Sequence, residues 1–152
     1  MTYFLSIIIG IMSSLAASLL FLLFLSRLKP RIVISSQIAK EKISENKIVY
    51  KIKVINKGVR SIINIKARLH LMILKVVSGG VMVRSIEIPL IRTDPLEIPG
   101  FDPKDVQASY AFRFRTYEDL DAIWNDDSTS YLRFRILAMD SLSGFGKVFK
   151  QD

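Results

Sequence analysis

The chain has 152 residues and a formal net charge of +8, with a single histidine and no cysteine. Because His70 stands alone, the sequence excludes a Cys/His zinc site and a Cys/His nucleophile. The net positive charge favours an anionic partner, such as a lipid headgroup, a nucleotide or a nucleic acid.

The N-terminal segment, residues 2–26, has no charged side chain and is almost wholly apolar. A helix that rises about 1.5 Å per residue needs about 20 such residues to cross a hydrocarbon core of roughly 30 Å. A removed secretory signal is the alternative, but no Lys or Arg precedes the run and no small-x-small site stands directly before Arg27. The sequence therefore predicts one retained transmembrane helix over residues 1–27, closed by Pro30.

Basic residues follow this predicted span, whereas the segment before it carries only the α-amino group of Met1. The first cations after the span are Arg27, Lys29, Arg31, Lys40 and Lys42. Under the positive-inside rule, we expect a single-pass protein of the cell membrane with its N-terminus outside and the C-terminal domain in the cytoplasm.

Small residues recur at every fourth position of the predicted span: Ser6, Gly10, Ser14 and Ser18. This spacing places them on one helical face, where small side chains let two helices approach closely. Small residues are also common in any membrane span. We interpret the stripe as a helix–helix association surface and expect a homo-oligomer.

Residues 28–46 form a basic juxtamembrane segment, with a short strand at 31–36 and a polar loop at 40–47. From residue 47 the chain alternates: 47–56 and 61–77 carry apolar side chains at every second position, and the second run is long enough to need a bulge. Gly79 and Gly80 turn the chain into a strand ending at Ile88. The four prolines within 89–105 predict a crossover rather than a central strand.

The remaining chain predicts three more strands, over 107–115, 131–139 and 147–150, and a short helix over 116–124. Thr116 is the expected cap of that helix, and 125–128 is an expected turn. Six or seven alternating strands in about 120 residues indicate an antiparallel β-sandwich, which we assign to residues 47–152.

No catalytic motif stands out. The sequence has neither a serine nucleophile elbow nor a dinucleotide fingerprint, and its acidic cluster near Asp119 fits helix-start and turn chemistry. We do not expect an enzyme, a catalytic residue, a bound metal or a cofactor.

Two basic groups are the candidate binding residues. Arg27, Lys29 and Arg31 are candidates for lipid-headgroup contact, although a plain positive-inside flank explains them equally well. The repeated Arg-Phe-Arg places Arg113 and Arg115 on one strand, and Arg133 and Arg135 on another. If these strands pair, four guanidiniums share one outer face and form an anionic-ligand site. The alternative is a solvated face offset by nearby acids.

The segments 25–36, 50–56 and 65–69 resemble the inner-helix exit and first cytoplasmic strands of inward-rectifier potassium channels. The resemblance implies an immunoglobulin-like cytoplasmic sandwich that assembles as a tetramer, with Arg27, Lys29 and Arg31 at phosphoinositide headgroups. The outer helix, pore helix and selectivity filter of that family are missing, so the resemblance does not extend to potassium selectivity.

We therefore expect a non-enzymatic, membrane-anchored sensor or regulatory module whose β-sandwich binds an anionic small molecule or a protein partner. The alternative is an oligomeric pore or membrane-disrupting effector gated by such a ligand, for example a nucleotide. Membrane lipids are expected partners in both cases, and a nucleic acid is not.

Overall fold

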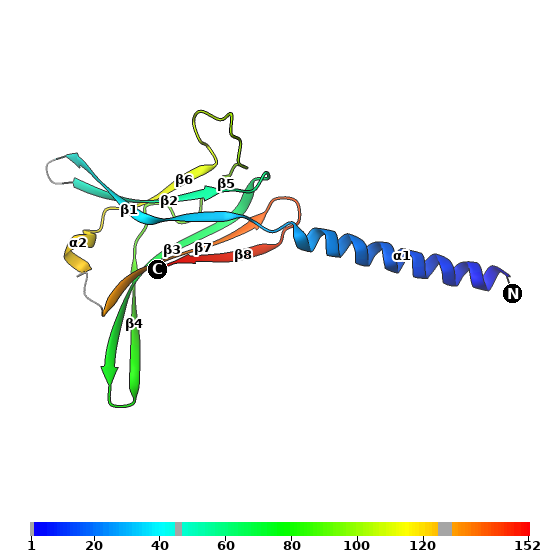
Figure 1. Ribbon diagram of the computed structural model, residues 1–152, viewed down its shortest axis with the longest axis horizontal. Coiled ribbons are helices and arrows are strands. Elements are labelled where there is room, and N and C mark those ends of the chain that lie inside the picture. Colours follow the sequence, from blue (N-terminus) through cyan, green and yellow to red (C-terminus); the bar gives the residue numbers. More distant parts are fainter. Residues whose placement is uncertain (1, 45–46, 125–128) are drawn as a thin grey trace.

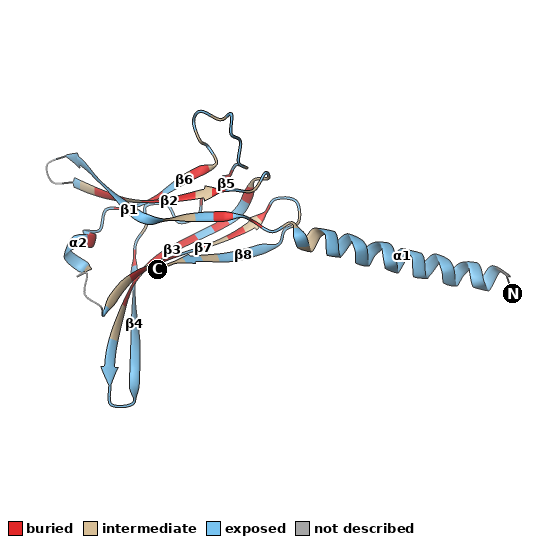
Figure 2. Cartoon of the chain, in the orientation of Figure 1, coloured by how far each residue is buried: buried red, intermediate tan, exposed pale blue. Residues whose placement is uncertain are grey.

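The computed structural model describes residues 2–44, 47–124 and 129–152. A long N-terminal helix, α1 (Thr2–Arg27), extends away from a β domain, and residues 28–31 join the two (Figure 1). By length and composition, α1 is capable of crossing a membrane. Its apolar side chains are exposed along its length (Figure 2).

The described part of the β domain contains eight strands and one short helix. They are β1 (Ile32–Ser44), β2 (Lys47–Asn56), β3 (Ile62–Val77), β4 (Gly80–Ile88), β5 (Glu97–Ile98), β6 (Ala111–Thr116), α2 (Leu120–Ile123), β7 (Ser130–Asp140) and β8 (Gly146–Gln151).

The strands form two antiparallel sheets that face each other. One sheet has the order β1-β2-β6, and the other has the order β4-β3-β7-β8, with β5 paired to β3. These orders correspond to strands A-B-E and C′-C-F-G of an immunoglobulin-type sandwich. The predicted fold class, a mainly β antiparallel sandwich preceded by one apolar helix, is confirmed.

The core lies between the two sheets and is built from the inward positions of the alternating strands. Val54, Phe114 and Ile136 have no exposed surface, and the Phe114 and Phe134 rings lie 5.3 Å apart. All of the buried core side chains come from residues 32–138, and α1 contributes none. Burial of apolar surface is the main stabilising term in folding, so we expect residues 28–152 to fold without α1.

The N-terminal part of the domain differs from the sequence prediction. Residues 40–44, predicted as loop, continue β1 and pair with β2 through Lys40↔Tyr50 and Lys42↔Ile48. Residues 45–46 of that predicted loop lie outside the described residues. The prediction failed because these side chains are polar, which is typical of a loop. The segment is nevertheless a strand, since it lies at the edge of the sheet and its backbone pairs with β2.

The bulge predicted in the long third strand is present. The β3–β7 register shifts between Ile63 and Lys66, and Asn64 adopts a left-handed conformation with φ of 49°. Strict alternation through the predicted strand 61–77 places Ile63 on the inner face with Ile65. Because the extra residue resets the alternation, Ile63 is exposed instead.

Two boundaries in the second half were also wrong. β6 begins at Ala111 instead of residue 107, because Ala108 has a positive φ of 50° and a turn precedes the strand. Asp119 caps α2 by accepting hydrogen bonds from the backbone of Asp121 and Ala122. Thr116, the predicted cap, is buried at the end of β6. The turn predicted at 125–128 lies outside the described residues.

Candidate anion-binding face

Four cations lie on the outer face of the three-stranded sheet, in two directly opposed pairs. The register of β2 and β6 places Lys51 opposite Arg115 and Lys53 opposite Arg113. Their side chains point outward because the alternate residues, such as Ile52 and Phe114, fill the core. We call Lys51, Lys53, Arg113 and Arg115 the cationic ladder.

The charges of this ladder are only partly neutralised. Lys51 forms an ion pair with Glu41 of β1, and its side chain is 24% exposed. Within the described residues, Lys53, Arg113 and Arg115 have no carboxylate within the 4.0 Å of an ion pair. Like charges directly opposite each other on a sheet destabilise the pairing. An anion bound across the ladder would therefore relieve repulsion as well as gain attraction.

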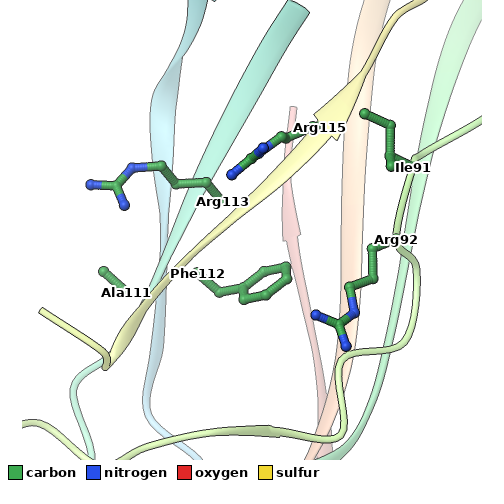
Figure 3. A pocket seen from close by; sticks show the side chains of 6 residues that line it. All are labelled: Ile91, Arg92, Ala111, Phe112, Arg113 and Arg115. Carbon is green, nitrogen blue, oxygen red and sulfur yellow. The ribbon is translucent and has the colours of Figure 1, made fainter. Parts of the chain in front are cut away.

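A groove along the outer edge of β6 adds a third guanidinium. Its volume is about 390 Å³, and Arg92 reaches it from the segment between β4 and β6. That segment is fixed to β6 by a hydrogen bond from the Ile91 N–H to the Arg115 carbonyl, at 2.8 Å. Figure 3 shows Arg113 and Arg115 on one side of β6 and Arg92 beside Phe112 on the other. All three arginines line the groove, but the Arg92 guanidinium lies across β6 from the other two.

The site predicted from the repeated Arg-Phe-Arg is not assembled, because β6 and β7 belong to different sheets. Arg133 and Arg135 lie on β7, which pairs with β3 and β8. The Arg133 guanidinium binds the Asp152 carboxylate, and this hydrogen bond raises the pKa of Arg133. Arg135 stands opposite Arg68 and Lys150. The two halves of the predicted cluster therefore occupy opposite outer faces of the sandwich.

Sequence reasoning missed Lys51, Lys53 and Arg92 as members of the site. The alternation of residues 47–56 does predict that the two lysines face outward. It does not predict that β2 pairs with β6, which is what places them beside Arg113 and Arg115. Arg92 lies in the proline-containing segment between β4 and β6, whose path has no local periodicity.

A second basic region lies where α1 joins the domain. Arg27, Lys29 and Arg31 line a hollow of about 200 Å³ together with Lys57 and Arg60 from the β2–β3 turn. The joint is fixed by a hydrogen bond from the Ser143 hydroxyl to the Leu28 carbonyl, at 2.6 Å. The structure therefore brings the three predicted headgroup residues together and adds two further cations.

One of these cations is held by a buried acid. Arg60 donates from Nε to Asp140 Oδ2 at 2.9 Å, and Asp140 also accepts from the backbone N–H groups of Leu142 and Ser143. Burial raises the pKa of the Asp140 carboxyl, but the Arg60 and backbone hydrogen bonds outweigh it and hold that pKa below its ordinary value. Asp140 thus links the β2–β3 turn to the loop that contacts Leu28.

The predicted helix–helix residues lie on α1. Ser6, Gly10, Ser14 and Ser18 are exposed, as expected for a helix surface that no part of the domain covers. A Cβ added at Gly10 would meet no atom within 4 Å. This face of the helix is therefore sterically open to another helix.

Comparison with known proteins assigns neither a family nor a function to the chain. No protein-family model matches the sequence. No curated protein matches it either. Spo0M, a sporulation control protein from Bacillus subtilis, aligns with a TM-score of 0.42 and 14% identity over 79% of this chain. This chain covers 47% of the length of Spo0M.

Two smaller proteins align over similar shares of the chain. The E. coli curli protein CsgC aligns with a TM-score of 0.30 and 12% identity, over 80% of this chain and 96% of CsgC. The structural-genomics target SoR45 has the same TM-score and 14% identity, over 80% of this chain and 85% of its own. These scores carry no functional inference, and the resemblance to potassium channels stays a prediction.

Proposed function

We propose that this chain is a non-enzymatic, single-pass membrane module whose β-sandwich binds an anionic ligand on the cationic ladder. In this proposal α1 crosses the membrane with its N-terminus outside, and the sandwich lies in the cytoplasm. The observation that carries the proposal is the pairing of Lys53 with Arg113 and of Lys51 with Arg115 on one outer face of the sheet.

The chemistry of the ladder favours a phosphate-bearing ligand. A guanidinium offers planar paired donors that match phosphate oxygens, which a lysine ammonium does not. The two guanidiniums of the ladder, with the Lys51 and Lys53 ammoniums opposite them, suit a ligand with more than one phosphate, such as a nucleotide or an inositol phosphate. The ladder lies on an outer face of the sheet and is not enclosed, so recognition would rest on charge more than on burial.

The distribution of basic residues supports the proposed membrane orientation. The group Arg27, Lys29, Arg31, Lys57 and Arg60 gathers at the end of the domain nearest α1. In the cytoplasmic orientation this end faces anionic lipid headgroups, where each nearby Lys or Arg contributes about 1 kcal/mol of attraction. Lipid contact at this end would leave the ladder on the side of the sandwich free for its own ligand.

The test is calorimetric titration of residues 28–152 with adenosine triphosphate, inositol hexakisphosphate and inorganic phosphate. The ladder variant is Lys53→Gln/Arg113→Gln. The matched control is Arg68→Gln/Arg135→Gln, because those residues are also directly opposed, lie on the other sheet, and carry the same total charge.

We expect the ladder variant to bind the tightest of these ligands about 10- to 100-fold more weakly, since a hydrogen bond to a charged group contributes about 1.5–3 kcal/mol. The control should bind like the parent, and affinity should fall with salt. If both variants lost affinity equally, the loss would reflect the lower net charge of the domain and not a site on the ladder. No binding by the parent would leave the ladder a solvated face and would refute the proposal.

A ligand-gated oligomeric pore or membrane-disrupting effector is the second candidate, and the small-residue face of α1 is the observation that favours it. The two candidates differ in what expression does to a cell. The binding module should leave membrane potential unchanged, whereas the effector should depolarise the membrane when its ligand is present.

A further inference from the structure

Two exposed apolar side chains stand at the end of the domain from which α1 leaves. Val59 lies in the turn between β2 and β3 and is 89% exposed, and Leu142 lies in the turn between β7 and β8 and is 64% exposed. Figure 1 shows both turns beside the C-terminal end of α1. We call Val59 and Leu142 the apolar tips. Neither belongs to the core of the sandwich, so the fold itself gives no reason for an apolar side chain at these positions.

Hydrogen bonds fix both turns to the residues that directly follow α1. The Ser143 hydroxyl donates to the Leu28 carbonyl at 2.6 Å, and the Lys57 N–H donates to the Arg31 carbonyl at 2.7 Å. The ion pair of Arg60 with the end of β7 joins the two turns to each other. The apolar tips therefore hold a fixed place beside the point where α1 ends. If α1 crosses a membrane, this place is the membrane surface.

The surroundings of the apolar tips are strongly basic. Val59 lines the hollow at the joint together with five cations, Arg27, Lys29, Arg31, Lys57 and Arg60, and the one acid among the described residues that line it is Asp140. A soluble anion would use these cations and leave the apolar tips in water. An anionic bilayer uses both, because it attracts the cations and buries apolar side chains below its headgroups.

We propose that the apolar tips insert into the headgroup layer of the membrane that α1 crosses, so that the sandwich docks on this membrane through its β2–β3 and β7–β8 turns. The inference rests on the membrane span of the proposed function. It goes further because it gives the sandwich a membrane affinity of its own and one orientation. Figure 1 shows β2 running away from the α1 end, so the cationic ladder on its outer face stays open to solvent in the docked domain.

The first test is binding of residues 28–152, which lack the span, to vesicles of phosphatidylcholine with about one-third phosphatidylserine. Sedimentation of the vesicles measures the bound fraction. The tip variant is Val59→Ser/Leu142→Ser. The matched control is Val76→Ser/Val81→Ser, because these side chains are 87% and 64% exposed and lie on the β3–β4 hairpin, which points away from α1 (Figure 1).

The parent should bind these vesicles, and more weakly those of phosphatidylcholine alone. The tip variant should bind about 10- to 100-fold more weakly, which is the change expected when roughly half of a valine and half of a leucine side chain leave water. The control should bind like the parent. No binding by the parent, unchanged binding by the tip variant, or an equal loss in both variants would overturn the inference.

The second test locates the tips in the full chain, reconstituted in vesicles whose acyl chains carry bromine, a quencher of tryptophan fluorescence. Trp124 is the only tryptophan and directly follows α2, at the end of the domain away from α1, so the parent should not be quenched (Figure 1). Leu142→Trp should add a quenched signal, whereas Val81→Trp should add an unquenched one. Equal quenching of the two variants, or none in either, would refute the docking.

Failure of the docking and failure of the proposed function can be told apart. A reporter fused after Asp152 tests the membrane orientation, and calorimetric titration tests the cationic ladder, and neither measurement depends on Val59 or Leu142. A chain that passes those two tests but loses no vesicle affinity in the tip variant would keep its proposed function and refute the docking alone.

Discussion

Replacing Asp140 by asparagine should destabilise the domain by about 2 kcal/mol at neutral pH. Asp140 is 4% exposed and pairs with Arg60, whose side chain is 37% exposed. Removing one partner of a fully buried pair costs roughly 3–5 kcal/mol, and the solvent around Arg60 screens part of this. The asparagine oxygen still accepts from the Leu142 and Ser143 N–H groups, so these bonds are not counted as lost.

The effect should depend on pH with a definite sign. The native pKa of Asp140 lies below its ordinary value of about 3.9. Its contribution to stability is therefore complete at neutral pH, and it is lost as the pH falls through the native pKa. The difference between parent and Asp140→Asn should begin to shrink below about pH 4, where the unfolded carboxyl takes up a proton, and should disappear only below the native pKa, where both side chains are neutral.

The assay is urea unfolding of residues 28–152, followed by circular dichroism at neutral and acidic pH. A loss of about 2 kcal/mol should also lower Tm by about 8 °C for a domain of this size. Asp94→Asn is the control, because Asp94 is exposed and its side chain accepts only from the Thr93 hydroxyl in the described structure. If the Asp140 variant matched the parent at neutral pH, or if its deficit persisted unchanged in acid, the ion-pair argument would be wrong.

Three further predictions follow from other regions. Gly100→Ala should destabilise the domain by about 1–3 kcal/mol in the same urea assay, because the new Cβ would lie 2.0 Å from the Val59 carbonyl oxygen. Gly79→Ala is the control and should have little effect, since no atom lies within 4 Å of its new Cβ. Replacing Gly10, Ser14 and Ser18 by leucine should weaken association of the isolated helix in a membrane two-hybrid assay but leave insertion unchanged; equal association would make the stripe incidental. A reporter fused after Asp152 should be active in the cytoplasm, and alkaline-phosphatase activity there would reverse the proposed orientation.

The features that depend only on the pattern of neighbouring residues could be predicted from the sequence. An uninterrupted apolar run predicted α1, and alternation in 47–56, 61–77 and 131–139 predicted strands and identified most of their inward faces. The antiparallel sandwich followed from the number and length of these runs. Local patterns failed where a neighbour sets the conformation, as in residues 40–44, which are strand because they pair with β2.

The candidate sites depended on information that no single segment carries. Alternation turns Arg113 and Arg133 outward on their strands, but it does not say that β6 pairs with β2 while β7 pairs with β3. Side-chain direction repeats every two residues and is local, whereas strand partners are chosen by how the whole core closes between the sheets. For this reason only the tertiary structure placed Lys53 beside Arg113 and separated Arg133 from both.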